Sequence, residues 1–201
     1  MKTPLVAIGG FTKQVYNKLK PDDPDRKKLD IVIQETGRLE SLVKGMLDFG
    51  KPIQLQTTKT NLNELVLESI EVAQPMTRKT GVELKADLNP CLPSLLLDAC
   101  RVKQVLLNLT TNAIQASPDG EGVLVTTHLV NSGVSLTVSD RGCGISEENS
   151  ESVFHPFFTT KKRGTGLGLG IVKKIVEAHG GEVFFCPNPE KGVTFSVVFP
   201  F

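Results

Sequence analysis

The sequence lacks the features that mark several large classes of protein. No apolar run approaches the ~20 residues that a helix needs to cross a bilayer, and no apolar stretch of signal-peptide type follows the first residues. The four cysteines form no Cys-x-x-Cys pair, and none has a histidine at metal-ligand spacing, so we expect free thiols in a reducing cytosol. We therefore expect a soluble, cytoplasmic chain, while an inner-membrane anchor in a longer parent protein stays open.

The sequence also lacks an excess of charge of either sign. The 201 residues include 23 Lys and Arg against 22 Asp and Glu, which gives a net charge of +1. Such a balance provides no bulk attraction to nucleic acid, and we expect no nucleic-acid partner. Hydrophobic residues make up 39% and charged residues 22%, which is typical of a globular protein with room for one domain and a smaller one.

The first fifty residues carry the hydrophobic spacing of a coiled coil. Apolar or threonine side chains recur at steps of three and four over 5–19 and again over 29–46, with prolines and aspartates in between. The pattern predicts two helices joined by a turn. Two antiparallel helices bury little alone, so we expect a homodimer through a four-helix bundle. The alternative is a hairpin that packs on the rest of its own chain.

The remainder mixes strands with helices. We predict strands at 53–57, 82–88, 123–130, 134–138, 182–186 and 193–199, and helices at 62–73, 99–116 and 167–178. Asp98 is a candidate N-cap, and a hairpin turn is predicted at 131–133. The fold class is α+β: a helical hairpin (1–50), a linker (51–59) and an α/β sandwich (60–201) with helices on one face of a mixed sheet.

Two asparagines stand four residues apart in the predicted helix over 99–116. Asn108 and Asn112 therefore share one helix face, beside an apolar stripe. Two carboxamides on one face can offer oxygens to a divalent cation and nitrogens to a phosphate. Taken alone, the pair is better explained by exposure of both residues on the helix surface.

An aspartate with two following glycines ends the strand predicted before position 139. Asp140, Gly142 and Gly144 form an Asp-x-Gly-x-Gly pattern, in which glycines permit a tight turn and close approach of a ligand. The carboxylate could accept a hydrogen bond from an exocyclic amine. A plain strand-to-loop turn is the alternative.

Four alternating glycines precede the last predicted helix, at Gly164, Gly166, Gly168 and Gly170. Successive free amides at a helix N-terminus form an anion site, and three basic residues just before them, Lys161, Lys162 and Arg163, add positive charge. The position near the end of the chain argues against a dinucleotide fingerprint, and no Gly-Lys-Ser or Gly-Lys-Thr occurs for a Walker motif.

An aromatic segment lies between these motifs. We expect Phe154 and Phe157 to pack in the interior, and His155 is as consistent with an ordinary loop residue as with a catalytic one. His128 and His179 have no supporting partners in the sequence pattern, so neither is assigned a role.

In this order the four motifs resemble the N, G1, F and G2 boxes of the histidine-kinase branch of the GHKL ATPases, a group with the Bergerat fold that also includes DNA gyrase. The resemblance covers roughly residues 53–201, and the ordered set is specific although each box alone is weak. The hairpin resembles the family's dimerisation and phosphotransfer domain, in which Thr3-Pro4-Leu5 is similar to the end of the H box. By that alignment the phosphoacceptor histidine would lie two residues before Met1.

The resemblance implies roles for individual residues. Asp140 would bind the adenine amino group of ATP or ADP, Asn112 would ligate Mg²⁺, and Asn108 would lie near the phosphates as a catalytic residue. Gly142 and Gly144 would line the adenine side. The triphosphate and its lid would involve Thr159, Thr160, Lys161, Lys162, Arg163, Gly164, Gly166, Leu167, Gly168 and Gly170. Whether Gln115, where many relatives are basic, or a basic lid residue contacts phosphate stays open.

The resemblance also implies an activity: transfer of the ATP γ-phosphate to a histidine and then to an aspartate of a response-regulator receiver domain. Thr3, four residues after the expected histidine, would place a water for dephosphorylation of that regulator. Two alternatives remain, namely a GHKL protein-serine kinase of the anti-sigma type and a nucleotide-gated scaffold without activity. The hairpin argues against the serine kinase, which needs no phosphotransfer helices.

Overall fold

A computed structural model describes residues 2–161 and 164–201. The described residues form two compact units, one comprising residues 2–52 with the described part of 157–167, the other comprising 53–156 with 168–201. Within the described ranges, no helix combines the length and the apolar character needed to span a membrane.

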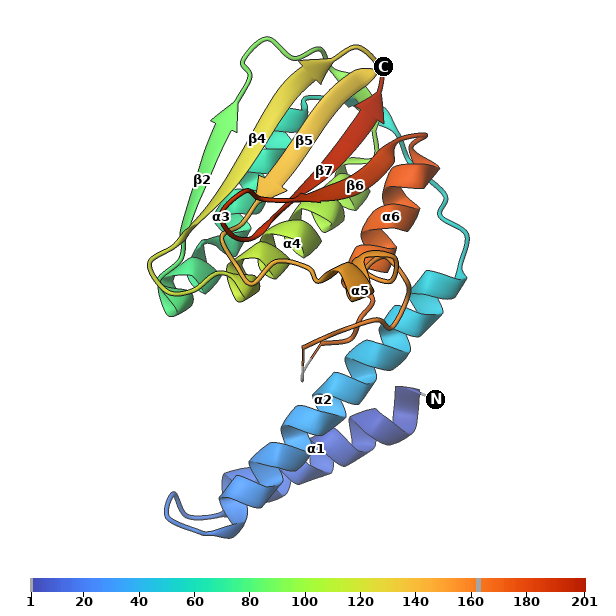
Figure 1. Cartoon of the computed structure of the whole chain (residues 1–201). Coiled ribbons are helices and arrows are strands. Elements are labelled where there is room, and N and C mark those ends of the chain that lie inside the picture. Colours follow the sequence, from blue (N-terminus) through green and yellow to red (C-terminus); the bar gives the residue numbers. More distant parts are fainter. Residues whose placement is uncertain (1, 162–163) are drawn as a thin grey trace. The chain divides into compact units, whose positions relative to one another are not determined.

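The N-terminal part of the first unit is a pair of antiparallel helices (Figure 1), α1 (Lys2–Lys18) and α2 (Asp25–Gly50). The turn between them is held by polar contacts. The guanidinium of Arg26 stacks 4.3 Å from the ring centre of Tyr16 and donates to the carbonyl of Leu19 at 3.2 Å. The backbone N–H of Asp25 donates to the Asp23 carboxylate at 2.9 Å. The predicted two-helix hairpin is therefore confirmed.

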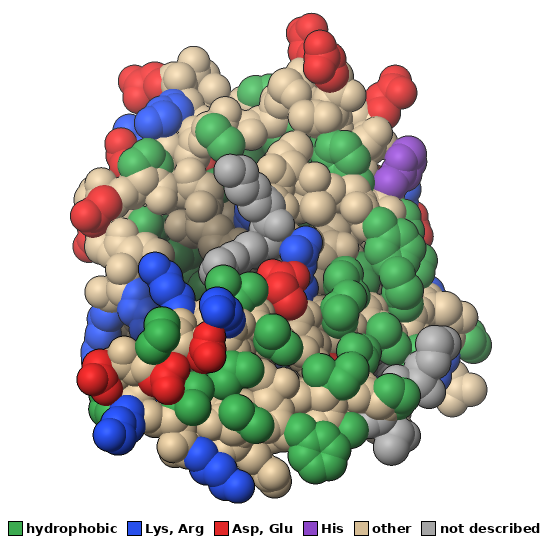
Figure 2. Space-filling model, turned by 90° about the horizontal axis from the view of Figure 1, so that it is seen from below, with side chains coloured by type: hydrophobic (Ala, Val, Ile, Leu, Met, Phe, Trp, Pro, Cys, Tyr) green, Lys and Arg blue, Asp and Glu red, His purple; other side chains and the backbone are tan. Residues whose placement is uncertain are grey.

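The predicted apolar stripe is wider than the contact between these two helices. Thr36 is buried, and Gly9 opposite it allows close approach, since a Cβ at Gly9 would lie 3.3 Å from the Thr36 methyl. Other members of the stripe remain 41–50% exposed, namely Ile8, Val15, Val32, Leu39 and Met46. Figure 2 shows hydrophobic side chains gathered over the hairpin. An apolar face is thus left open on a single chain.

The second unit contains a five-stranded sheet in the order β2-β4-β5-β7-β6. Its strands are β2 (Glu83–Leu88), β4 (Gly122–Val130), β5 (Gly133–Ser139), β6 (Glu182–Pro187) and β7 (Val193–Pro200). Strands β2 and β4 are parallel. The other three neighbouring pairs are antiparallel: β4-β5 and β6-β7 are hairpins, and β5 pairs with β7. The predicted α+β class with a mixed sheet is confirmed, as is the turn at 131–133.

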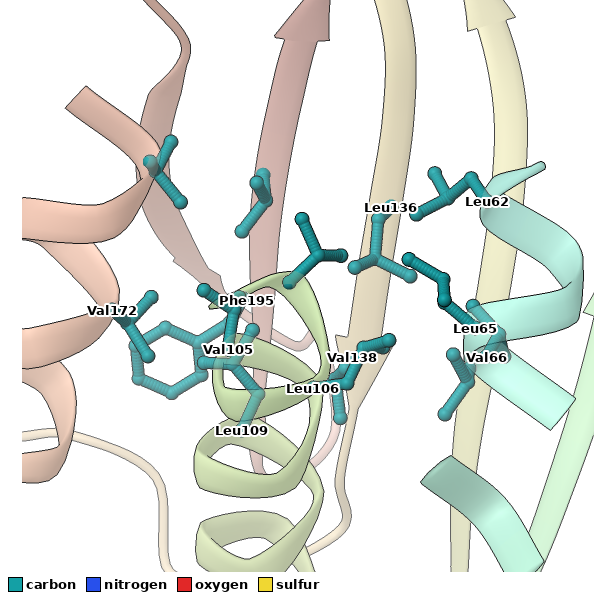
Figure 3. Close-up of a cluster of buried hydrophobic side chains, with 14 of the residues drawn as sticks. Leu62, Leu65, Val66, Val105, Leu106, Leu109, Leu136, Val138, Val172 and Phe195 are labelled. Carbon is teal, nitrogen blue, oxygen red and sulfur yellow. The ribbon is translucent and has the colours of Figure 1, made fainter. Parts of the chain in front are cut away.

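Three helices cover one face of this sheet: α3 (Leu62–Thr80), α4 (Ala99–Ala116) and α6 (Gly168–Ala178). Figure 3 shows how their apolar side chains point toward the strands, with Val105 of α4 and Val172 of α6 beside Phe195 of β7. The opposite face is polar, and the hydroxyls of Thr126 and Thr137 lie 2.6 Å apart on it. This one-sided burial gives the two-layer sandwich its single core.

Four elements differ from the prediction. Residues 53–57 are not a strand; instead β1 (Thr58–Thr60) pairs antiparallel with β3 (Leu95–Leu97), which was not predicted. Helix α5 (Glu147–Ser150) was also missed. Helix α3 continues past the predicted end at Ala73, through Pro75, to Thr80. Beyond Pro75, Met76 packs against the core and Thr77 is buried, and Gly81 ends the helix with a left-handed φ of +66°.

Asp98 is the N-cap of α4, as predicted, and it also joins three segments of the chain. Its two carboxylate oxygens accept the backbone N–H groups of Arg101 at 3.1 Å and Gln56 at 2.9 Å. Burial by itself would raise the pKa of this carboxyl. The hydrogen bonds from Gln56 and Arg101 and the positive charge of Arg101 outweigh that effect, so the pKa of Asp98 lies below its ordinary value of 3.8.

His179 does have partners, contrary to expectation. Its Nε2 accepts the backbone N–H of Asp98 at 3.0 Å, and its Nδ1 lies 2.8 Å from the carbonyl of Ile175. Because a carbonyl can only accept, the ring proton sits on Nδ1. An edge-on contact with Phe199, 5.6 Å between ring centres, completes the site. His179 therefore connects the end of α6 to the start of α4.

Replacing Asp98 by alanine should lower the free energy of unfolding by about 1–3 kcal/mol near pH 7, because a helix cap and a buried acceptor are both lost. A depressed native pKa stabilises the fold above the unfolded value of 3.8, and this contribution disappears as pH falls through the native pKa. Urea denaturation should thus show a gap between the unchanged chain and Asp98→Asn that is constant well above pH 3.8 and shrinks as the pH falls below that value. Asp87→Asn, at an exposed carboxylate, is the control. A pH-independent gap would contradict the assignment.

Candidate functional site

Two carboxamides on α4 lie beside the start of α6. Asn108 and Asn112 are half-buried on one face of α4, while Leu106, Leu109 and Ala113 face the core. A Cβ built on Gly168 would lie 3.6 Å from Oδ1 of Asn108 and 3.8 Å from Nδ2 of Asn112. The absence of a side chain at Gly168 thus keeps the space between the two amides and the first turn of α6 open.

The carboxamide of Asn108 has a donor without a partner among the described residues. Nδ2 of Asn108 is buried and has no hydrogen-bond partner among the described residues. A buried donor left unpaired costs about 1–3 kcal/mol, so this position favours a ligand that brings an acceptor oxygen. Asn108 therefore has the chemistry to hold an anionic oxygen.

The first turn of α6 adds backbone donors to the same space. The helix runs over Gly168–Ala178, and its first N–H groups have no partner within the helix. These groups and the positive end of the helix dipole favour an anion such as phosphate. The predicted residues Gly168 and Gly170 thus lie at the start of a helix that faces the α4 asparagines.

Asp140 lies immediately after β5 and is only 3% exposed. Its Oδ1 accepts two backbone N–H groups, from Gly142 at 2.8 Å and from Val193 at 3.3 Å. Gly142 is required by close packing, because a Cβ there would lie 2.6 Å from the carbonyl oxygen of Ala116 at the end of α4. Gly144 turns the chain with a φ of +71°. The Asp-x-Gly-x-Gly pattern thus holds a buried carboxylate in a fixed orientation.

The predicted lid residues belong to the first unit. Thr159, Thr160 and Lys161 are exposed, and the hydroxyl of Thr159 accepts the backbone N–H of Lys161 at 3.1 Å. Gly164 donates its N–H to the carbonyl of Lys161 at 3.1 Å. Lys162 and Arg163, also predicted to contact phosphate, lie outside the described residues.

The end of this segment is held by packing. Gly166 has a φ of +68°, and a Cβ there would lie 2.3 Å from the backbone of Phe157. Leu167 is buried, and its side chain occupies the space that a Cβ on Gly45 of α2 would need. Gly166 thus lies directly against the backbone of Phe157, which precedes the lid.

The aromatic segment only partly follows the prediction. Phe154 packs as expected, with ring centres 6.2 Å from those of both Phe185 and Phe195. Phe157 does not pack in the interior: it is 48% exposed and has a left-handed φ of +68°, which turns it out of the core. His155 is exposed, and so is His128 on β4.

The donors at this site fit Mg²⁺ held together with phosphate. Among the described residues, no three His, Cys, Asp or Glu side chains cluster as they would around a fully protein-bound metal. Mg²⁺ prefers oxygen ligands and usually keeps waters and substrate phosphates in its shell, so a single amide oxygen suffices from the protein. Asn112 offers such an oxygen. Thr3, the other residue considered for catalysis, lies in the first turn of α1.

A buried aspartate, a pair of helix carboxamides and a glycine-initiated helix on one α+β sandwich define a GHKL-type ATPase domain. The sequence profile of the histidine kinase-, DNA gyrase B- and HSP90-like ATPases matches residues 97–201, and the chain belongs to this family. The curated relatives that it matches include sensor histidine kinases. The sensor histidine kinase ZraS of Escherichia coli (strain K12) is 34% identical over 200 residues, which is all of this chain but 43% of ZraS.

Solved histidine kinases share the fold. Full-length ShkA, in complex with AMPPNP, superposes with a TM-score of 0.83 at 29% identity and covers all of this chain, which corresponds to 43% of ShkA. ThkA in complex with the response regulator protein TrrA superposes with a TM-score of 0.77 at 34% identity, over 98% of this chain and 57% of ThkA. The chain thus spans 43% of ZraS and of ShkA and 57% of the ThkA chain.

Proposed function

We propose that this chain is the core of an ATP-dependent protein histidine kinase in a two-component signalling system. The observation that carries the proposal is the pair of α4 carboxamides beside the first turn of α6, with the buried Nδ2 of Asn108 unpaired among the described residues. ShkA, which carries AMPPNP, and the sensor kinase relatives support ATP as the nucleotide. The proposed domains are the hairpin (1–50), the linker (51–59) and the catalytic domain (60–201).

In this proposal each end of the nucleotide meets a different group. Asp140 accepts a hydrogen bond from the 6-amino group of adenine, and Gly142 and Gly144 line the base. Nδ2 of Asn108 donates to a phosphate oxygen, and the first amides of α6 bind the phosphates. The oxygen of Asn112 ligates Mg²⁺, which when bound neutralises charge on the β- and γ-phosphates. The lid residues 159–167 contribute hydroxyl, amide and ammonium donors to the triphosphate.

The amide at position 108 also bears on the type of reaction. In gyrase-type relatives a glutamate at this place activates water, whereas an amide cannot take a proton from water. The bound γ-phosphate is therefore protected from hydrolysis and reserved for a positioned acceptor. Transfer breaks the bond between the γ-phosphorus and the β–γ bridging oxygen, forms a bond to a histidine nitrogen, and leaves ADP.

We propose a response-regulator receiver domain as the partner that takes the phosphoryl group onto an aspartate. The complex of ThkA with TrrA supports this class of partner. Thr3 would then help to place the water that removes the phosphoryl group from the regulator. Because ATP and receiver domains are cytoplasmic, we place the catalytic part in the cytoplasm, whether or not the parent protein is anchored in a membrane.

The decisive experiment uses the chain extended upstream by His-Glu, in continuous helical register with α1. With γ-labelled ATP and Mg²⁺ this protein should acquire a label that is stable to base and labile to acid, as phosphohistidine is, and should pass it to a receiver domain. An acid-stable label would favour the serine kinase. Bound nucleotide without any label would favour the scaffold.

The open apolar face of the hairpin predicts a homodimer. Burying large apolar side chains contributes about 1.5–3 kcal/mol each, so a charge at Leu39 should prevent association. Light scattering should find a dimer for the unchanged chain at high micromolar concentration and a monomer for Leu39→Asp. Leu67→Asp, at an exposed leucine of α3, is the control and should remain dimeric. A monomeric unchanged chain, also when extended upstream, would rule out the dimer.

A further inference from the structure

The turn between β6 and β7 is fastened to the strand end that carries Asp140. Asn188 is the first residue after β6, and its backbone N–H donates to the carbonyl of Gly192 at 3.1 Å across the turn. Its side-chain Nδ2 donates to the backbone carbonyl of Asp140 at 2.8 Å and to the hydroxyl of Ser139 at 3.2 Å. Figure 1 shows this turn beside the end of β5.

The same side chain closes a ring of hydrogen bonds with two hydroxyls. Oγ1 of Thr194 lies 2.7 Å from Oδ1 of Asn188 and 2.8 Å from Oγ of Ser139. Oδ1 of Asn188 can only accept, so it takes a hydrogen bond from the hydroxyl of Thr194, which also lies at donating distance from Oγ of Ser139. Ser139 in turn accepts from Nδ2 of Asn188. The three side chains thus connect the end of β5, the turn and β7 through hydrogen bonds.

The turn holds Asp140 by its main chain and by its carboxylate. The backbone N–H of Asp140 donates to the carbonyl of Val193 at 3.0 Å, and the N–H of Val193 donates to the carboxylate at 3.3 Å. Gly192 permits this contact, because a Cβ there would lie 2.0 Å from the carbonyl oxygen of Asp140. The orientation of the carboxylate therefore depends on the position of the β6–β7 turn.

We propose that Asn188 is a positioning residue for adenine recognition. It acts through Asp140: with Ser139 and Thr194 it fixes the turn whose N–H groups aim the carboxylate, and so it sets the preference for a 6-amino purine. This inference rests on the proposed function. A hydrogen bond weakens steeply when its geometry is lost, so release of the turn should reduce the contribution of the amino group specifically.

The test compares ADP with purine riboside 5′-diphosphate, which is ADP without the 6-amino group, by calorimetry in the presence of Mg²⁺. Asn188→Ala should weaken ADP binding about 5- to 10-fold, the equivalent of one hydrogen bond, and leave the affinity for the analogue unchanged. In the Asp140→Asn background the same substitution should have no further effect, because the group it positions is gone. Thr194→Val should behave like Asn188→Ala, and Thr194→Ser, which keeps the hydroxyl, should restore the preference.

The control is Thr126→Val, which breaks the Thr126–Thr137 hydroxyl pair on the same sheet. It should lower the melting temperature without changing the ratio of the two affinities. Equal weakening of both ligands by Asn188→Ala, or no change in either, would reduce Asn188 to a structural residue. An unchanged chain that binds both ligands equally, or neither, would instead overturn the role of Asp140 in the proposed function, and this inference with it.

Discussion

Calorimetric titration of the Asp140→Asn chain with ADP and Mg²⁺ should give an affinity about 10- to 100-fold below that of the unchanged chain. The hydrogen bond from the adenine amine to a carboxylate is charge-assisted, and its loss corresponds to about 1.5–3 kcal/mol. Asp140 is 3% exposed and its Oδ1 is fixed by two backbone N–H groups, so no other orientation of the side chain compensates.

The control for this substitution is Asp87→Asn, which removes the same charge from an exposed position on β2. It should bind ADP as the unchanged chain does, because long-range charge effects are screened in buffer. The melting temperature of each protein without nucleotide separates a loss of binding from a loss of fold. Equal affinities for Asp140→Asn and the unchanged chain would remove Asp140 from the adenine site.

The elements that could be predicted are those specified by local sequence. The cap at Asp98, the hairpin turn at 131–133 and the heptad-like spacing of the first fifty residues each act through neighbours within a few positions. The pairing of β1 with β3 could not be predicted, because each strand has three residues and its partner lies far away in the sequence. Such short strands exist only through tertiary contacts.

Pro75 and Phe157 illustrate two other limits. A proline is a strong signal for a helix end, yet α3 continues through Pro75 to Thr80, with Met76 packed against the core and Thr77 buried. A phenylalanine is a strong signal for burial, yet Phe157 is exposed because the turn into the lid requires a left-handed φ there. In both cases a tertiary requirement outweighs a local preference.

Some residues of the candidate site could likewise be predicted from the sequence, and others could not. Spacing in the sequence is enough to propose Asn108, Asn112 and Asp140. The helix periodicity and the glycine pattern at the strand end can both be read from neighbouring residues. His179 and Asn188 could not, because their partners Asp98 and Asp140 are distant in sequence. Asparagine is common in turns, so the sequence alone does not distinguish a positioning residue such as Asn188 from an ordinary turn residue.

The 201-residue chain itself should not acquire a phosphohistidine label from γ-labelled ATP. Its three histidines lie at 128, 155 and 179, and none lies on α1 or α2, where the resemblance places the acceptor. His128 is on the polar face of β4, and both ring nitrogens of His179 already lie at hydrogen-bond distance from backbone groups. A nitrogen that is engaged in this way cannot attack a γ-phosphate in line.

The measurement is acid-labile label per chain after incubation with ATP and Mg²⁺, with the His-Glu-extended protein as the positive control. The loss expected for the 201-residue chain is complete, because none of its three histidines lies on α1 or α2. Thr3→Ala in the extended protein serves as a matched variant: it should be labelled as fully as its parent, since Thr3 is proposed to act on the regulator and not on ATP. His155→Gln in the 201-residue chain tests whether the exposed histidine of the aromatic segment accepts any label. Label on that chain that disappears with His155→Gln would contradict the prediction and assign the acceptor to the loop before the lid.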